Sequence, residues 1–114
     1  MLSLTAGMRY KYCEGNVSFR YKWDAMISYI RYILHEDPCS GTVFIFMNRK
    51  HNQLRVFYYE RGGFVISEKK LDRQYKFLTP CFDVKKQTYS ISWSDFVSLL
   101  EDKQIRRFHL REVI

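Results

Sequence analysis

The 114-residue sequence is poor in the residues that build metal centres or interrupt a fold: it has three cysteines, two prolines and five glycines. Cys13, Cys39 and Cys81 are odd in number and widely spaced, and neither a Cys-x-x-Cys pair nor a nearby histidine run completes a zinc site. We therefore expect a reduced, cytoplasmic setting, no metal site and no cofactor. All three cysteines are expected to be small buried hydrophobes.

Long apolar runs are also missing. Every apolar stretch is cut by Arg, Lys or Glu within about eight positions, well short of the roughly eighteen residues that cross a bilayer. The first residues, MLSLTAGMRYKYC, do not resemble a secretory signal, because no long apolar region follows a charged one. No repeat, low-complexity tract or linker divides the chain, so we expect one domain over residues 1–114 and no membrane partner.

Recognisable catalytic patterns are absent as well. The sequence contains no nucleophile with its base and no phosphate-binding Gly-x-x-x-x-Gly-Lys loop. The nearest approach to a metal-binding carboxylate pair is Glu60 with Asp72, which flank a predicted strand. We expect no enzymatic activity, and an undetected metal-dependent nuclease is the less favoured alternative.

Positive charge and aromatic rings are what the sequence has in excess. Nineteen Lys and Arg against twelve Asp and Glu give a formal net charge of +7, and 18% of residues are aromatic. A positive excess attracts phosphate polyanions or acidic surfaces, and aromatic residues favour strands and argue against disorder. The same charge is also typical of an ordinary solvated surface, so two interpretations stay open: nucleic-acid binding and a charged surface without a ligand.

The N-terminal third predicts a strand, a helix and a turn. Residues 9–13 alternate basic and aromatic side chains, as a short edge strand would. Apolar residues then recur at three- and four-residue steps over residues 19–34, which predicts an amphipathic helix. Ser18 is the expected N-cap, and Asp37-Pro38 is the expected stop.

Residues 42–70 predict the centre of the sheet. An apolar strand at 42–47, buried on both faces, forms a hairpin with 54–59, and the turn Glu60-Arg61-Gly62-Gly63 reverses the chain into 64–69. The fold class we expect is α+β: an antiparallel sheet built on this central three-stranded meander, packed by the N-terminal amphipathic helix and a shorter C-terminal helix.

The C-terminal part is less regular. Residues 71–77 form a short strand or a loop, residues 88–92 a last short strand, and Ser92 begins the second helix with capping-box spacing. The basic tail, 103–114, has no clear period. It is an ordered strand, an arm that orders on nucleic acid, or a dimer contact.

Two sets of residues are candidate contacts. Basic side chains neutralise phosphates, and exposed rings stack on bases. The candidate nucleic-acid-binding residues are Arg49, Lys50, Arg55, Lys69, Lys70, Arg73 and Lys76. For a protein partner, the candidate contacts are Tyr58, Tyr59, Arg106 and Arg107.

Several of these segments resemble one family of small accessory proteins. DPCSG at 37–41 with VFIFMNR at 43–49 is similar to the family signature D-P-x-S-G-x-x-F-x-F-x-N-R. LRVFYY at 54–59, Gly63-Phe64 and KKLD at 69–72 resemble the blocks that follow it, and of the family's Thr-Asp-Met-Arg only Arg20 is kept. The family is the TnpB or Orf2-like proteins encoded beside the transposase of bacterial IS66 insertion sequences, and the resemblance spans about residues 10–102.

The resemblance implies a role in DNA transposition, beside a separate transposase that carries the cutting chemistry. Together with the positive charge, it leads us to expect a non-enzymatic accessory that binds the DNA of the element ends, the transposase complex, or both. A protein-interaction module without direct DNA contact is the alternative, and a homo-oligomer is compatible with either.

Overall fold

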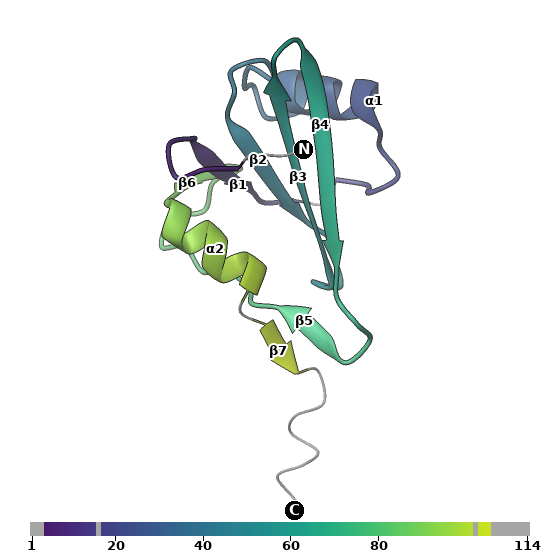
Figure 1. The fold of residues 1–114 in the computed structure, drawn as a ribbon, viewed down its shortest axis with the longest axis vertical. Coiled ribbons are helices and arrows are strands. Elements are labelled where there is room, and N and C mark those ends of the chain that lie inside the picture. Colours follow the sequence, from purple (N-terminus) through teal and green to yellow (C-terminus); the bar gives the residue numbers. More distant parts are fainter. Residues whose placement is uncertain (1–3, 16, 102, 106–114) are drawn as a thin grey trace, which may run out of the picture.

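A five-stranded sheet is the main layer of the protein, seen in a computed structural model that describes residues 4–15, 17–101 and 103–105, the last three as backbone only (Figure 1). The strand order is β4-β3-β2-β1-β6. These strands are β1 (Tyr10–Cys13), β2 (Val43–Met47), β3 (Gln53–Glu60), β4 (Gly63–Lys70) and β6 (Thr88–Ile91). The remaining elements are α1 (Trp23–Ser28), the π-helical η1 (Tyr29–Ile33), α2 (Trp93–Glu101), and a second small sheet of β5 (Tyr75–Phe77) with β7 (Lys103–Ile105).

The sheet is mixed, so the predicted antiparallel sheet is wrong. β1 runs parallel to β2, whereas the β1–β6, β2–β3 and β3–β4 pairs are antiparallel. β1 also lies inside the sheet and is not the predicted edge strand; the edges are β4 and β6. The helical crossover between β1 and β2 permits this pairing, since parallel strands need a connection of roughly a dozen residues or more.

The predicted helix over residues 19–34 is wrong in extent. α1 and η1 together cover eleven residues, of which the first six are α-helical. The start is delayed because the backbone carbonyls of Phe19 and Tyr21 accept hydrogen bonds from the Arg55 guanidinium, at 2.7 Å each. Ser18 does not cap the helix; its hydroxyl accepts a bond within the preceding loop.

The two faces of the sheet have separate clusters of buried residues. On one face, Met26, Ile30 and Leu34 pack against aromatic residues of β2 and β3. On the other, Phe96 and Leu99 of α2 pack against β1, β2 and β3. The helical segments cover only part of the sheet, since no residue of β4 is fully buried. The predicted description of a helix-packed sheet is therefore wrong as well.

Three local predictions are confirmed. All five residues of β2 are buried, as expected for a central strand. The β3–β4 hairpin closes through Arg61 and Gly62, whose φ angles of +50° and +82° are those of a two-residue turn that matches strand twist. α2 begins at the Ser92 cap, where the Asp95 amide donates to the Ser92 hydroxyl at 3.0 Å.

The cysteine prediction is wrong for two of the three residues. Cys13 is a buried free thiol, whereas Cys39 and Cys81 are exposed free thiols. None of the helices in the described part of the chain is long and apolar enough to cross a lipid bilayer.

Candidate nucleic-acid interface

Arg55 fixes the loop that precedes α1. Its side chain is 2% exposed, and its Nε donates to the Glu68 carboxylate at 2.6 Å while its two terminal nitrogens hold the carbonyls of Phe19 and Tyr21. The guanidinium carbon also lies 4.9 Å from the centre of the Phe19 ring, within cation–π range. Every arm of the guanidinium is occupied, so the loop over residues 17–22 is held firmly against β3.

Asn48 organises the turn between β2 and β3. Its side-chain oxygen accepts from the backbone amides of Asn52 and Gln53, both at 3.0 Å, and its side-chain nitrogen donates to the Asn52 side chain at 2.6 Å. Side-chain bonds of this kind replace the backbone bonds that a tight turn leaves unmade. The bonds of Asn48 therefore fix the turn that carries Arg49 and Lys50, which are both exposed.

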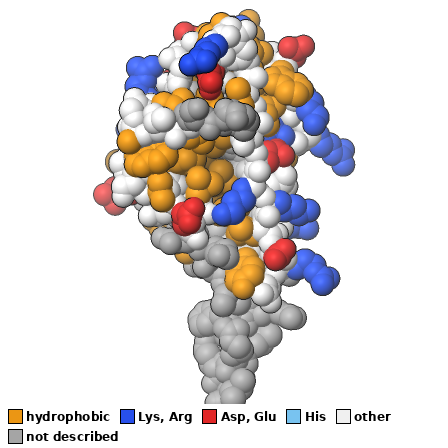
Figure 2. All heavy atoms as spheres, in the orientation of Figure 1, with side chains coloured by type: hydrophobic (Ala, Val, Ile, Leu, Met, Phe, Trp, Pro, Cys, Tyr) orange, Lys and Arg blue, Asp and Glu red, His pale blue; other side chains and the backbone are white. Residues whose placement is uncertain are grey.

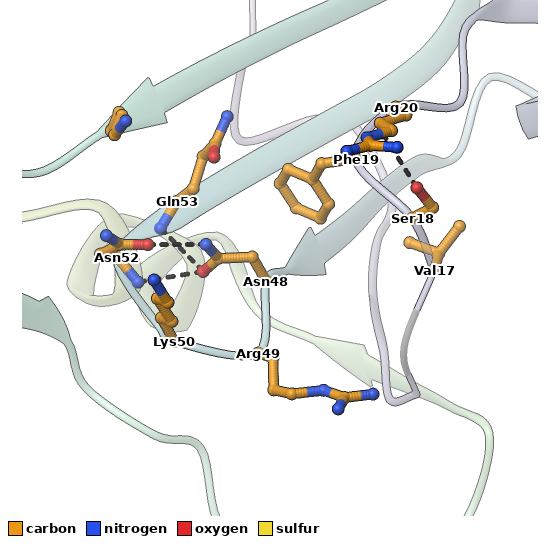
Figure 3. A pocket seen from close by; sticks show the side chains of 10 residues that line it. Val17, Ser18, Phe19, Arg20, Asn48, Arg49, Lys50, Asn52 and Gln53 are labelled. Atoms are coloured by element: carbon orange, nitrogen blue, oxygen red, sulfur yellow. Dashed lines mark hydrogen bonds between the residues drawn. The ribbon is translucent and has the colours of Figure 1, made fainter.

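The loop and the turn face each other across an open groove of about 810 Å³, drawn in Figure 3. One side is the loop over residues 17–20, and the other is the β2–β3 turn with the first residue of β3 and the last of β4. We call this feature the basic groove. Its lining residues are Val17, Ser18, Phe19, Arg20, Asn48, Arg49, Lys50, Asn52, Gln53 and Lys70.

The charge of the basic groove is of one sign. Four of its ten lining residues are cations, namely Arg20, Arg49, Lys50 and Lys70, and none is acidic. The nearby carboxylate of Glu68 is engaged by Arg55. In the view of Figure 2, Lys and Arg side chains are more numerous on the right-hand side, with Asp and Glu side chains between them. A concave surface lined by one sign of charge concentrates counter-ions, so this groove suits a polyanion.

Strand alternation separates the two lysines at the end of β4. Lys70 pairs with Gln53 and lines the basic groove, whereas Lys69 pairs with Leu54, whose side chain belongs to the α2 face. The Lys69 ammonium donates to the carbonyl of Leu100, in the last turn of α2, at 2.9 Å. A cation is favourable at that end of a helix. Lys69 therefore lies on the α2 side of the sheet, away from the basic groove.

The other predicted cations do not join the groove. The prediction for Arg55 is corrected, because its buried guanidinium has no surface left to offer a phosphate. Arg73 is exposed between β4 and β5, and Lys76 lies half-buried in β5, but neither lines the groove. Sequence reasoning also left Arg20 out of the candidate set, although its place in the family motif was a signal for it.

Of the four candidate contacts for a protein partner, Tyr58 and Tyr59 lie in the described part of the chain. Tyr58 is fully buried, so it is corrected to a core residue. Tyr59 is half-buried, with its ring centre 5.1 Å from that of Phe64. Arg106 and Arg107 lie outside the described residues.

The proposed carboxylate pair is not brought together. Glu60 lies at the turn before β4 and Asp72 lies beyond its other end, and eight extended residues span roughly 26 Å. Among the residues that the structure describes, no three His, Cys, Asp or Glu side chains are grouped to hold a metal ion. In the β2–β3 turn, burial, aided by Lys76, lowers the pKa of the His51 imidazole.

These features define a class: a small basic protein with a mixed sheet, short helices and a basic groove whose lining contains no carboxylate. The family model described as IS66 Orf2 like protein matches residues 8–109. The chain belongs to that family, which confirms the resemblance and makes it an accessory protein of an insertion sequence.

One curated relative is similar over a large part of its length. It is an uncharacterised protein of Sinorhizobium fredii, y4jC, with 28% identity over 80 residues, which are 70% of this chain and 68% of the relative. No solved structure matches the chain.

Proposed function

We propose that this protein is a DNA-binding accessory in transposition that holds element DNA by its phosphate backbone in the basic groove. The observation that carries the proposal is the meeting of four cations from three separate segments in a groove without a carboxylate. Phosphate contacts supply most of the affinity of a protein for DNA and position it on the strand. The cutting chemistry would then belong to a separate transposase, the expected partner of this protein.

The arrangement favours binding over catalysis. The hydrogen bonds of Asn48 fix the backbone that carries Arg49 and Lys50, and those of Arg55 fix the backbone on either side of Arg20. A loop and a turn fixed before the ligand arrives lose less backbone freedom on binding. The groove is wide and open, and its lining offers amides, hydroxyls and cations but no carboxylate to act as a base.

The test is DNA affinity measured as a function of salt. Four phosphate contacts on a duplex predict a slope of about −3.6 in a plot of log affinity against log salt. The double substitution Arg49→Gln with Lys50→Gln should reduce that slope by about two and weaken binding at every sequence tested. Arg73→Gln, which removes one exposed cation outside the groove, is the control, and its match in charge is Arg49→Gln alone.

Two outcomes would contradict the proposal. Salt-independent binding would mean that phosphates are not the ligand. Equal losses in the groove variant and in Arg73→Gln would mean that the groove is not the place where they bind.

A further inference from the structure

A second surface, made of exposed aromatic and apolar side chains, follows the basic groove along the chain. Four of the five exposed large hydrophobic side chains among the described residues come from a single stretch: Tyr21, Trp23, Tyr32 and Ile33, at 39%, 49%, 67% and 49% exposure. A shallow cleft of about 350 Å³ runs along this side of the helix. We call its lining the aromatic patch: Tyr21, Ala25, Ser28, Tyr29, Tyr32 and Ile33.

The aromatic patch is continuous with the basic groove along the chain. Arg20 lines the groove and the next residue, Tyr21, lines the patch, with α-carbons about 3.8 Å apart. Arg55 holds the carbonyls on either side of Arg20, those of Phe19 and Tyr21, so this junction is fixed. The groove and the patch are therefore lined by consecutive residues of one fixed loop.

The surroundings of the patch are basic. Arg20, Lys22 and Arg31 are exposed on the same loop and helix, and Asp24 is the acidic residue exposed on the stretch 20–33. Aromatic rings on a loop and helix that also carry exposed cations suit a ligand with flat apolar rings and a negative backbone. Three of the six lining residues are tyrosines, whose rings stack on bases of any sequence.

We propose that the preferred ligand is single-stranded DNA, with its phosphates in the basic groove and its bases stacked on Tyr21 and Tyr32. This inference rests on the proposed function and narrows it to one form of DNA. Duplex DNA offers its phosphates to the groove, but its bases are already stacked on one another and cannot lie on the patch. Unpaired strands offer both.

The experiment compares fluorescence anisotropy of a labelled oligonucleotide of about 12 nucleotides, within the usual range of single-strand sites, with that of its duplex at equal salt. Wild type should bind the single strand more tightly. Tyr21→Ala with Tyr32→Ala should weaken single-strand binding by roughly 5- to 150-fold for each base that loses its stacking partner. The same variant should bind the duplex as wild type does.

Two controls separate the chemistry from damage to the fold. Tyr21→Phe with Tyr32→Phe keeps both rings and should retain single-strand affinity. Val84→Ala removes an apolar side chain that is 62% exposed outside the patch, and it should change nothing. Trp23 lies two residues after Tyr21 and is one of two tryptophans in the chain, so part of the tryptophan fluorescence should change when a base stacks nearby.

The outcomes distinguish the two proposals. Equal affinity for both DNA forms, or an unchanged single-strand affinity in the tyrosine-to-alanine variant, overturns this inference and leaves the groove proposal standing. Loss of transposase co-purification in that variant with normal DNA binding also overturns it, since the patch would then bind a protein. Normal binding of both DNA forms by the Arg49→Gln, Lys50→Gln variant overturns the groove proposal itself.

Discussion

Replacing Arg55 by methionine tests the role that the structure gives this residue. Methionine retains most of the apolar stem but removes the guanidinium, so the carbonyls of Phe19 and Tyr21 and the carboxylate of Glu68 lose their partner. Bonds to a charged donor contribute about 1.5–3 kcal/mol each. The Glu68 side chain is 32% exposed, so that pair adds only about 1 kcal/mol.

These contributions do not simply add. Burying the charge of Arg55 has a cost that the methionine variant avoids, which offsets part of the loss. We expect the free energy of unfolding to fall by about 2–4 kcal/mol, a large share of the roughly 5–15 kcal/mol of a typical domain. In urea, this corresponds to a midpoint lower by on the order of 1–3 M.

Equilibrium unfolding in urea, followed by tryptophan fluorescence, measures this change. Arg73→Met is the matched control; it removes an exposed arginine and should stay within about 0.5 kcal/mol of wild type. Glu68→Gln leaves both carbonyl bonds in place and should lose about 1 kcal/mol. If Arg55→Met unfolds like wild type yet binds DNA poorly, then Arg55 contacts DNA and the buried role assigned to it is refuted.

Three further predictions concern the turn and the thiols. Asn48→Ala should lower the free energy of unfolding by about 1–3 kcal/mol, seen in the same urea assay, because the Asn52 and Gln53 amides lose their acceptor. A thiol reagent should modify the two exposed cysteines of the native protein at once and Cys13 only after unfolding, since burial raises its pKa. The pKa of His51 is lower in the folded protein than in the unfolded chain, so the unfolded chain binds a proton more readily. The free energy of unfolding of wild type should therefore fall as the pH drops through 6.5 and below. His51→Asn should make the free energy of unfolding less dependent on pH in this range.

Local patterns were enough to predict the hairpins but not the parallel pair. The β3–β4 ladder follows from alternating side chains and a glycine turn, both of which are properties of neighbouring residues. The pairing of Tyr10 with Val43 depends on the crossover through α1 and η1, and strand alternation within β1 looks the same for either direction. The strand–helix–strand order was the signal for it.

The helix start and the role of Arg55 share one cause. Apolar periodicity extends back to Phe19, but its carbonyl is bound by a residue 36 positions away, and a local pattern does not contain that information. One signal was present, because alternation places Arg55 on the same side of β3 as Phe57, which is buried. An arginine on a buried face is almost always paired, and its partners lie in the structure around it.

Charge counted along the sequence predicts more phosphate contacts than the basic groove offers. The seven candidate cations would give a duplex salt slope of about −6, whereas the four that line the basic groove give about −3.6. The structure explains why fewer cations line the groove than the sequence suggests. Adjacent Lys69 and Lys70 point to opposite faces of the sheet, and the Arg55 guanidinium is hydrogen-bonded inside the fold. A measured slope near −6 would require cations beyond the groove to touch DNA. A slope near −3.6 that falls by two in the Arg49→Gln, Lys50→Gln variant would assign the contacts to the groove.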